Sequence, residues 1–283
     1  MPYAHPESLI STEALAARLG APGLVVLDAT YFLPAQKRDA RAEFAERHIP
    51  GAAFFDVDGI SDRGSTLPHM LPDAATFAAA VGALGVGNDS EVVVYDAHGL
   101  MSAARAWWMF RAFGHDRVAL LDGGLPKWLA EGRPVESGAA RAQPRSFAAR
   151  LDAGRVRDKA ALLANLKSRR EQVIDARAAG RFNGTEPEVW PGRRPGHIPG
   201  ASNLPFTDLL DPRDKTLLPA DALAARFAAA GAAPGRPLVV SCGSGVTAAV
   251  LALGLHLIGR DDVALYDGSW AEWGLPGDTP VEP

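Results

Sequence analysis

The sequence predicts an α/β protein made of two consecutive domains, each a parallel sheet flanked by helices. Three observations lead to this prediction. The chain has 283 residues, 47% apolar and 22% charged, values typical of a soluble globular protein with two domains of ordinary size. Short apolar runs alternate with longer alanine- and leucine-rich segments, as strands and helices do in α/β folds. Motifs of the first half also recur in the second half.

The recurrence indicates a duplicated domain, because it occurs only twice and at offsets that are all close to 147 residues. Asp28, Asp175, Asp122 and Asp267 occupy repeated positions and are expected to cap turns, and His48 and His197 are expected to be structural. The matching segments are 27–29 with 174–176, 48–52 with 197–201, 92–96 with 238–242, and 118–124 with 263–269.

The elements of each copy follow from its apolar pattern. Short, continuous apolar runs suit strands of a sheet that is covered on both faces, and longer periodic segments suit helices. Trp107 and Trp108 lie on one predicted helix and are expected to pack between the domains. The predicted strands are 25–27, 92–95, 118–121 and 238–241, and the predicted helices are 73–84, 102–113, 220–230 and 246–258. A stretch without periodicity predicts a linker at 136–154 between domains 1–135 and 155–283.

Charge and composition exclude several classes of protein. The formal net charge is -4 with both signs interspersed, unlike the basic surface of a nucleic-acid-binding protein. No apolar run approaches the length of a membrane span, so we expect no membrane partner. The first residues lack the basic start and apolar core of a secretory signal, and the expected location is therefore the cytoplasm.

Cys242 is the only cysteine, which excludes an intrachain disulfide and a cysteine-based zinc site. It directly follows the predicted strand 238–241, and ligands of parallel α/β sheets bind at the carboxyl ends of strands. Gly243, Ser244 and Gly245 allow backbone N–H groups to converge there, and the predicted helix that starts near Val246 adds partial positive charge. This setting favours a thiolate, the nucleophilic form of cysteine.

Three other interpretations fit parts of this loop. Most free cysteines are small buried hydrophobic residues, but a glycine-bracketed position between strand and helix favours chemistry. Residues 243–248 match the dinucleotide fingerprint G-x-G-x-x-[GA], with Asp267 at the next strand end, yet that fingerprint normally opens a domain and only a short tail follows here. A cysteine phosphatase needs an arginine six residues after the cysteine, where this chain has Ala248.

The motifs of this chain together resemble a known family. Residues 242–248 resemble the active-site loop of 3-mercaptopyruvate sulfurtransferases, and residues 44–52 and 266–273 resemble the two signatures of rhodaneses. The resemblance covers nearly the whole chain and implies two tandem rhodanese-like domains. The first would be inactive, because Asp96 stands at the position of Cys242 and a carboxylate cannot form a persulfide.

The resemblance implies transfer of sulfur from 3-mercaptopyruvate, through a persulfide on Cys242, to a thiol such as thioredoxin or a small thiol, or to cyanide, with release of pyruvate. No metal or organic cofactor is implied. Thiosulfate sulfurtransferases also resemble this chain but carry two basic residues after the cysteine, where Gly243 and Ser244 stand here. Thiosulfate is therefore the alternative donor. A rhodanese-fold binding module without turnover is the other alternative, and loss of the cysteine is its usual mark.

The resemblance also implies roles for individual residues. Asp58, His69 and Ser244 match a relay that moves protons to the leaving group, and Gly243, Gly245, Val246 and Thr247 match the substrate-binding loop. Arg181 matches an arginine that binds the substrate carboxylate. The family has a second arginine nine residues later, where this chain has Trp190, and we expect Arg193 and Arg194 to replace it.

Overall fold

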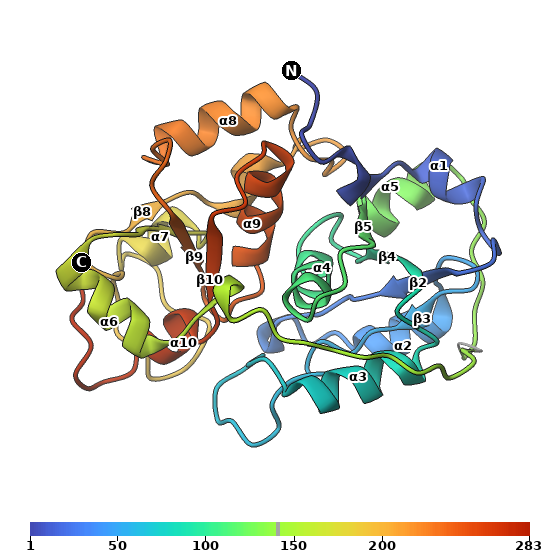
Figure 1. The fold of residues 1–283 in the computed structure, drawn as a ribbon, viewed down its shortest axis with the longest axis horizontal. Helices are drawn as coiled ribbons and strands as arrows, with labels where there is room; N and C mark the ends of the chain where they lie inside the picture. The colour runs from blue at the N-terminus through green and yellow to red at the C-terminus, as the bar shows by residue number, and fades with distance from the viewer. Residues whose placement is uncertain (140–141) are drawn as a thin grey trace.

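The structure is a computed structural model that describes residues 1–139 and 142–283. It contains two five-stranded sheets, one in each half of the chain (Figure 1). All strand pairs within both sheets are parallel. The strand orders β1-β5-β4-β2-β3 and β6-β10-β9-β7-β8 correspond position by position. The predicted duplicated α/β fold is therefore confirmed.

The N-terminal sheet is built from short apolar strands, and aspartate side chains start two of its helices. The Asp39 carboxylate accepts hydrogen bonds from the amides at the start of α2, and Asp73 accepts one from the Thr76 amide at the start of α3. The strands are β1 (Leu9–Ile10), β2 (Leu24–Asp28), β3 (Ala53–Phe54), β4 (Glu91–Tyr95) and β5 (Val118–Leu121). The helices are α1 (Thr12–Ala16), α2 (Ala40–Glu46), α3 (Ala74–Ala83), α4 (Ala103–Ala112) and α5 (Gly124–Ala130), with 3-10 turns η1 (Pro6–Ser8) and η2 (Pro34–Gln36).

The C-terminal domain repeats this order with a shorter helix α7 in the place of α2. Its strands are β6 (Val156–Arg157), β7 (Gln172–Asp175), β8 (Ser202–Asn203), β9 (Leu238–Ser241) and β10 (Val263–Tyr266). Its helices are α6 (Lys159–Ser168), α7 (Ala179–Phe182), α8 (Ala220–Ala229), α9 (Ala248–Leu257) and α10 (Ser269–Trp273), with 3-10 turns η3 (Ala153–Arg155) and η4 (Phe206–Leu209).

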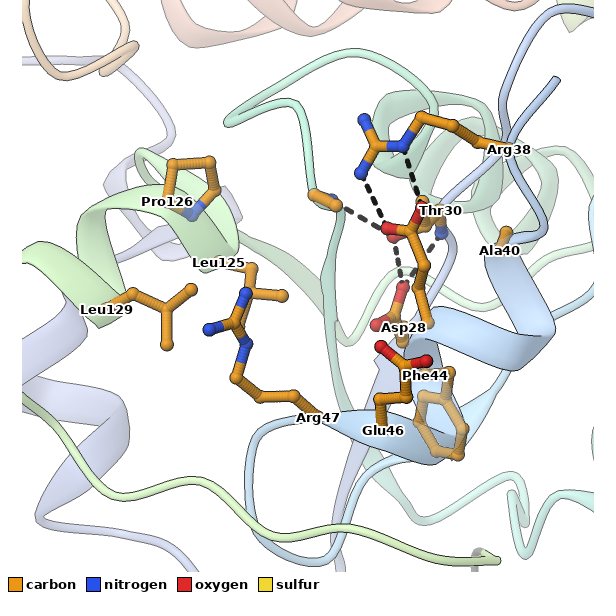
Figure 2. A pocket seen from close by; sticks show the side chains of 12 residues that line it. Asp28, Thr30, Arg38, Ala40, Phe44, Glu46, Arg47, Leu125, Pro126 and Leu129 are labelled. Atoms are coloured by element: carbon orange, nitrogen blue, oxygen red, sulfur yellow. Dashed lines mark hydrogen bonds and ion pairs between the residues drawn. The ribbon is translucent and has the colours of Figure 1, made fainter. Parts of the chain in front are cut away.

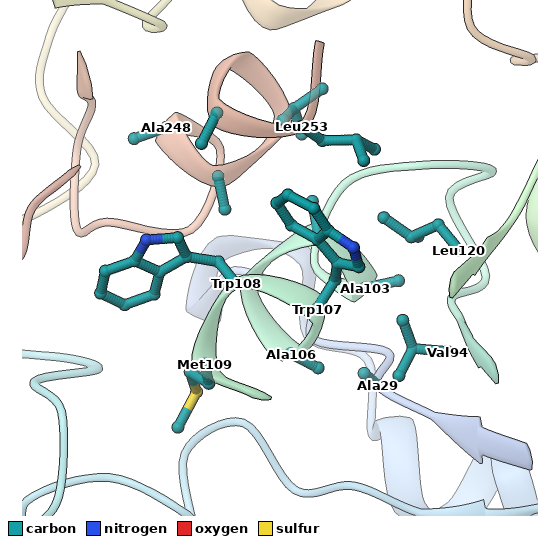
Figure 3. Close-up of a cluster of buried hydrophobic side chains, with 14 of the residues drawn as sticks. Ala29, Val94, Ala103, Ala106, Trp107, Trp108, Met109, Leu120, Ala248 and Leu253 are labelled. Carbon is teal, nitrogen blue, oxygen red and sulfur yellow. The ribbon is translucent and has the colours of Figure 1, made fainter. Parts of the chain in front are cut away.

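The two domains meet where α4 packs on α9, and one apolar cluster runs from the first sheet through both helices to the second (Figure 3). Trp107 and Trp108 lie on the α4 side of this contact and are only 2% and 3% exposed. The prediction that they pack between the domains is confirmed. This packing brings the start of α4 to the loop that precedes α9, because Arg105 Nη1 donates to the Gly245 carbonyl (3.4 Å).

Segments at both ends of the N-terminal domain tie the two halves together. The Ala4 amide donates to the Leu257 carbonyl at the end of α9 (2.8 Å), so the first residues reach the C-terminal domain. After α5 the chain is extended along the N-terminal domain, where the Arg145 amide donates to the Gly82 carbonyl (2.9 Å), before it enters the second sheet (Figure 1). Residues 140 and 141 of the predicted linker lie outside the described residues.

One predicted helix begins later than expected. The prediction started it at Val246, whereas α9 starts at Ala248. Val246 and Thr247 form a tighter turn, because the Ala249 and Val250 amides donate to carbonyls three residues earlier, those of Val246 (3.3 Å) and Thr247 (3.1 Å), and not four residues earlier as in an α-helix. Among the described residues, none of the helices combines the length and the apolar character needed to cross a bilayer.

Candidate active site

Cys242 lies at the carboxyl end of β9, and its loop is fastened to α10. The Cys242 amide donates to Ser269 Oγ (3.2 Å). The carbonyls of Cys242 and Gly243 accept hydrogen bonds from the amides of Trp270 (2.9 Å) and Ala271 (2.7 Å). The thiol residue itself is 1% exposed. The segment 266–273, noted in the sequence as a signature, therefore holds the cysteine loop in place.

The amides that follow Cys242 remain available to a ligand. Within residues 1–139 and 142–283, no acceptor is found for the backbone N–H groups of residues 243–247. Unpaired amides next to a helix N-terminus attract an anion. In the first copy the same kind of loop is filled, because the Asp96 carboxylate accepts hydrogen bonds from the amides of His98, Met101 and Ala103, each at 2.8 Å.

His69 brings the N-terminal domain to this loop. Its Nδ1 lies 2.9 Å from Ser244 Oγ, across 175 residues of sequence, and its side chain is 1% exposed. Its Nε2 lies 3.0 Å from Asp58 Oδ1, a close ionic contact that falls outside hydrogen-bond geometry. The Asp58 side chain is 64% exposed and so connects the buried imidazole to water. Nδ1 and Ser244 Oγ share one hydrogen bond, whose direction depends on the tautomer of the imidazole.

Arg181 lies beside the first glycine of the loop. A Cβ atom at Gly243 would be only 3.0 Å from Arg181 Nη2, so any larger residue would displace the guanidinium. Arg181 Nη2 donates to Glu188 Oε2 (2.6 Å), and Arg177 Nη1 donates to the other oxygen of Glu188 (2.6 Å). Glu188 is 4% exposed and thus orients two arginines from within the protein.

Trp190 is also part of this site, although in the sequence it stands out only because it occupies the place of the second family arginine. Its Nε1 lies 3.8 Å from the position of a Cβ on Gly243. Its ring packs edge-on against His69, with centroids 5.8 Å apart. Tyr31, which the sequence analysis did not single out, packs edge-on against the same imidazole at 4.6 Å. Aromatic rings thus enclose His69 between the two domains.

The sequence predicted that Arg193 and Arg194 replace the second arginine. In the structure both donate hydrogen bonds to backbone carbonyls. Arg193 Nε donates to the Ala271 carbonyl (2.9 Å). Arg194 Nη2 donates to the carbonyls of Trp273 (3.0 Å) and Thr279 (2.8 Å), which pins the C-terminal tail. Neither arginine is brought to Gly243 as Arg181 is, although Arg193 bonds to α10, next to the cysteine loop.

The expectation that four repeated aspartates cap turns is right for one pair and wrong for the other. Asp28 and Asp175 accept the amides two residues later, at 2.9 Å each. Asp122 instead accepts the Leu217 amide, and Asp267 accepts the Leu71 amide, both at 2.8 Å and both across the domain boundary. These contacts depend on how the domains dock, which local sequence patterns do not contain.

A separate cavity of about 750 Å³ lies in the N-terminal domain and does not reach Cys242 (Figure 2). Its wall includes Asp28, whose pKa burial raises to about 6, and the ion pair of Arg38 with Glu43. Ala97 occupies the place that corresponds to Gly243, so this cavity is the first-copy counterpart of the cysteine site. It contains no thiol.

One cluster outside the loop has metal-ligand side chains. Donor atoms of His5, His256 and Asp261 lie within 4.8 Å of one another. However, the two imidazoles stack in parallel at 4.0 Å, so their ring nitrogens point side by side and do not converge on one point. Asp261 contacts both rings, at 3.3 Å and 2.5 Å. This arrangement is a polar contact that holds the first residues against the end of α9.

Known proteins that are similar to this chain have the domain organisation that the structure shows. The rhodanese-like domain family matches residues 11–131 and 158–275. The chain is 51% identical over 272 residues to human 3-mercaptopyruvate sulfurtransferase, covering 94% of this chain and 91% of that protein. It is 45% identical to bovine thiosulfate sulfurtransferase, covering 94% and 91%.

Among solved structures, the crystal structure of SseA from Escherichia coli, a 3-mercaptopyruvate sulfotransferase, superposes with a TM-score of 0.85 at 41% identity. The match covers 94% of this chain and 99% of that one. The chain therefore belongs to the rhodanese family, as a sulfurtransferase with two rhodanese-like domains.

Proposed function

We propose that this enzyme takes sulfur from 3-mercaptopyruvate onto Cys242 as a persulfide and passes it to a thiol or to cyanide. The observation that carries the proposal is the meeting of His69 and Ser244 beside the only thiol, at a loop whose amides have no acceptor among the described residues. An anionic sulfur is stabilised by such donors, both as thiolate and as persulfide.

The first half-reaction is nucleophilic attack on sulfur. The Cys242 thiolate attacks the sulfur atom of 3-mercaptopyruvate, and an S–S bond forms as the C–S bond breaks. The electron pair of the C–S bond passes to the organic fragment, which leaves as the enolate of pyruvate. Ser244 gives its proton to that enolate and takes one from Nδ1 of His69, and water beside the exposed Asp58 carboxylate returns a proton to the imidazole.

The second half-reaction restores the enzyme. A thiolate acceptor attacks the outer sulfur of the persulfide, the S–S bond breaks, and its electron pair returns to Cys242 as thiolate. A small thiol or thioredoxin supplies this chemistry, and cyanide forms thiocyanate in the same way. The burial of Cys242 at 1% keeps water away from the persulfide between the two steps.

Arg181 is proposed to bind the substrate carboxylate. Its guanidinium lies next to Gly243, at the mouth of the loop, and its side chain keeps 19% exposure although Glu188 fixes one edge. A guanidinium has five N–H donors, so bonds to Glu188 leave others for a carboxylate. Trp190 adds one indole N–H on the same side.

The choice of donor rests on charge. Gly243 and Ser244 are neutral, Arg181 lies beside Gly243, and the charge of Arg105 at Gly245 is paired with Asp267, which suits a singly charged keto acid more than dianionic thiosulfate. Thiosulfate is the second candidate donor because the chain is 45% identical to bovine thiosulfate sulfurtransferase.

The test is a single-turnover experiment with each donor and no acceptor. The intact protein is expected to gain the mass of one sulfur atom with 3-mercaptopyruvate, and to lose it as thiocyanate when cyanide is added. Cys242→Ser is the control and should gain nothing. If the wild-type protein releases pyruvate without any gain in mass, the persulfide route is wrong. A kcat/KM that is higher for thiosulfate would reverse the choice of donor.

A further inference from the structure

Arg105 is a buried cation in the apolar contact between the domains. It lies on α4, is 0% exposed, and its Cζ lies 4.6 Å from the centre of the Trp108 ring. Nη2 donates to Asp267 Oδ1 (2.6 Å) and to the His69 carbonyl (2.5 Å). Nη1 is directed at the Gly245 carbonyl (3.4 Å). One guanidinium thus contacts the His69 segment, the cysteine loop and the end of β10.

The contacts of Arg105 bracket the backbone of His69. This residue has a φ of +59°, a left-handed conformation that costs free energy for a residue other than glycine. Its carbonyl is held by Arg105, and two residues later the Leu71 amide donates to Asp267 Oδ2 (2.8 Å). The ion pair of Arg105 with Asp267 closes this arrangement, so the segment 69–71 is fixed at both ends.

The cysteine loop is fixed by the same guanidinium. A Cβ atom at Gly245 would lie 2.9 Å from Arg105 Nη1, and this glycine has a φ of +78°. Because Gly245 is next to Ser244, Arg105 sets both partners of the contact between His69 Nδ1 and Ser244 Oγ.

The equivalent contact across the domain boundary, near the Asp96 loop, provides an internal control. Lys215 has a φ of +63° and is followed by the Leu217 amide, which donates to Asp122, as His69 is followed by Leu71. The third residue of α9, Val250, stands where α4 has Arg105. The repeated contact therefore forms without a buried cation, and the cation is present only on the side that faces Cys242.

We infer that Arg105 is a positioning residue that aligns His69 with Ser244 when the two domains dock. It does not touch the reacting atoms. Its energetic role is to hold a strained histidine at hydrogen-bond distance from a serine in the other domain, and a small misplacement of such groups reduces the rate strongly. This inference rests on the proposed proton transfer through His69.

The test compares Arg105→Met with Arg111→Met, a matched arginine on the same helix. Arg111 is also largely buried and lies over Trp107, but it pairs with Asp116 and contacts neither His69 nor the cysteine loop. We expect Arg105→Met to lower kcat by about 10- to 100-fold with KM little changed. We expect Arg111→Met to lower the melting temperature while leaving kcat and its pH profile as in the wild-type protein.

The double variant with His69→Gln separates positioning from general destabilisation. If Arg105 acts through His69, the double variant is no slower than His69→Gln alone, because the lost alignment serves a group that is already absent. Multiplicative effects, or an unchanged pH profile of kcat in Arg105→Met, would overturn the inference. If His69→Gln itself keeps full activity, the proposed proton transfer is wrong and the inference falls with it.

Arg105→Lys keeps the experiment decisive if the methionine variant does not fold. A lysine keeps the charge but has no planar fork, so it can serve one of the two Nη2 acceptors well. We expect a kcat between those of wild type and His69→Gln, again without further loss in the double variant. A lysine variant with wild-type kcat and pH profile would contradict the inference.

Discussion

The loops that begin with Asp96 and Cys242 occupy the same place in two copies of one domain, yet they use their amides in opposite ways. Asp96 fills its own loop with a carboxylate that accepts three amide hydrogen bonds. The amides of this strand–helix turn can bind a carboxylate, as the Asp96 loop shows. In the second copy the corresponding amides, those of residues 243–247, lie next to Cys242 and have no acceptor among the described residues.

The difference extends to the segments that reach across the domain boundary. His69 approaches the cysteine loop, and Lys215 approaches Gly99 in the Asp96 loop, with nearly the same left-handed φ. His69 bonds to Ser244, whereas Lys215 Nζ donates to the Pro212 carbonyl (3.1 Å). The two copies thus share a docking geometry, but the segment that approaches the Cys242 loop brings an imidazole, whereas the segment that approaches the Asp96 loop brings a lysine.

The most direct test of this comparison replaces Cys242 with aspartate, the residue that the first copy has at this position. Cys242→Asp should abolish persulfide formation, the largest effect we expect, while the fold remains. The new carboxylate can accept hydrogen bonds from the amides of residues 243–247, as Asp96 does from its own loop. Mass spectrometry after incubation with the donor and a thermal melt would check both points. A melting temperature below that of Cys242→Ser would contradict the idea that both loops hold an anion.

The duplicated sheets and the position of Cys242 at the end of a strand could be predicted from the sequence, because both depend on local patterns. A strand, two glycines and a helix are visible within ten residues, and the repeat fixes the topology of one copy from the other. The contacts of Asp122 and Asp267 were not predictable, because their partners Leu217 and Leu71 come from the other domain.

Arg105 and Trp190 show two further limits of prediction from the sequence. The signal for Arg105 was an arginine in the first turn of helix 103–112, directly before a run of apolar residues, and a charge in such a position needs a buried partner. The partner is not local. Trp190 was visible only as a departure from the family, and its place between Gly243 and His69 follows from the folding of the loop after α7.

The position of Arg181 supplies the next comparison. Arg181 precedes Phe182, which stacks on His197 at 3.8 Å, and Glu43 precedes Phe44, which stacks on His48 at 4.0 Å. The charge is thus reversed between the copies. We expect Arg181→Met to raise KM for 3-mercaptopyruvate by about 10- to 100-fold, the value of a charged hydrogen-bonded pair, with a smaller effect on kcat.

The matched control for that prediction is Arg193→Met, which loses one bond to the Ala271 carbonyl. Steady-state kinetics with 3-mercaptopyruvate should leave its KM close to wild type. An equal rise in KM for both variants would mean that Arg193 binds the carboxylate as well.

A smaller effect is expected at Trp190. Trp190→Arg would place a second guanidinium beside Gly243, next to that of Arg181, in place of the single N–H donor of the indole. We expect KM for 3-mercaptopyruvate to fall by about 3- to 10-fold, because two arginines bind a carboxylate better than one. Trp190→Phe, which keeps the ring against His69 but removes the N–H, should raise KM slightly. If both variants raise KM alike, packing of the indole and not its donor matters.

The last expected effect concerns stability and not catalysis, at the two aspartates that end β2 and β7. Asp175 is paired with Arg177 (2.7 Å), whereas Asp28 bonds to Thr30 and lies near Asp96, with no ion pair to a cation among the described residues. Burial, with the charge of Asp96, raises the pKa of Asp28 from 3.8 to about 6. The folded state therefore holds this proton more tightly than the unfolded chain, and the stability linked to it is fully present below pH 3.8 and is lost as pH rises through 6.

The Asp28→Asn variant has no ionisable group at this position, so its free energy of unfolding should not fall as the pH rises through 6. Relative to wild type, the variant should gain about 1–2 kcal/mol in free energy of unfolding between pH 4 and pH 7. Urea titrations at several pH values would measure the difference. Asp175→Asn is the counterpart and should be destabilised at neutral pH, because it weakens the pairing of a buried guanidinium. Parallel pH curves for wild type and Asp28→Asn would mean that Asp28 is ionised as easily in the folded protein as in the unfolded chain, and that the two copies do not differ in this respect.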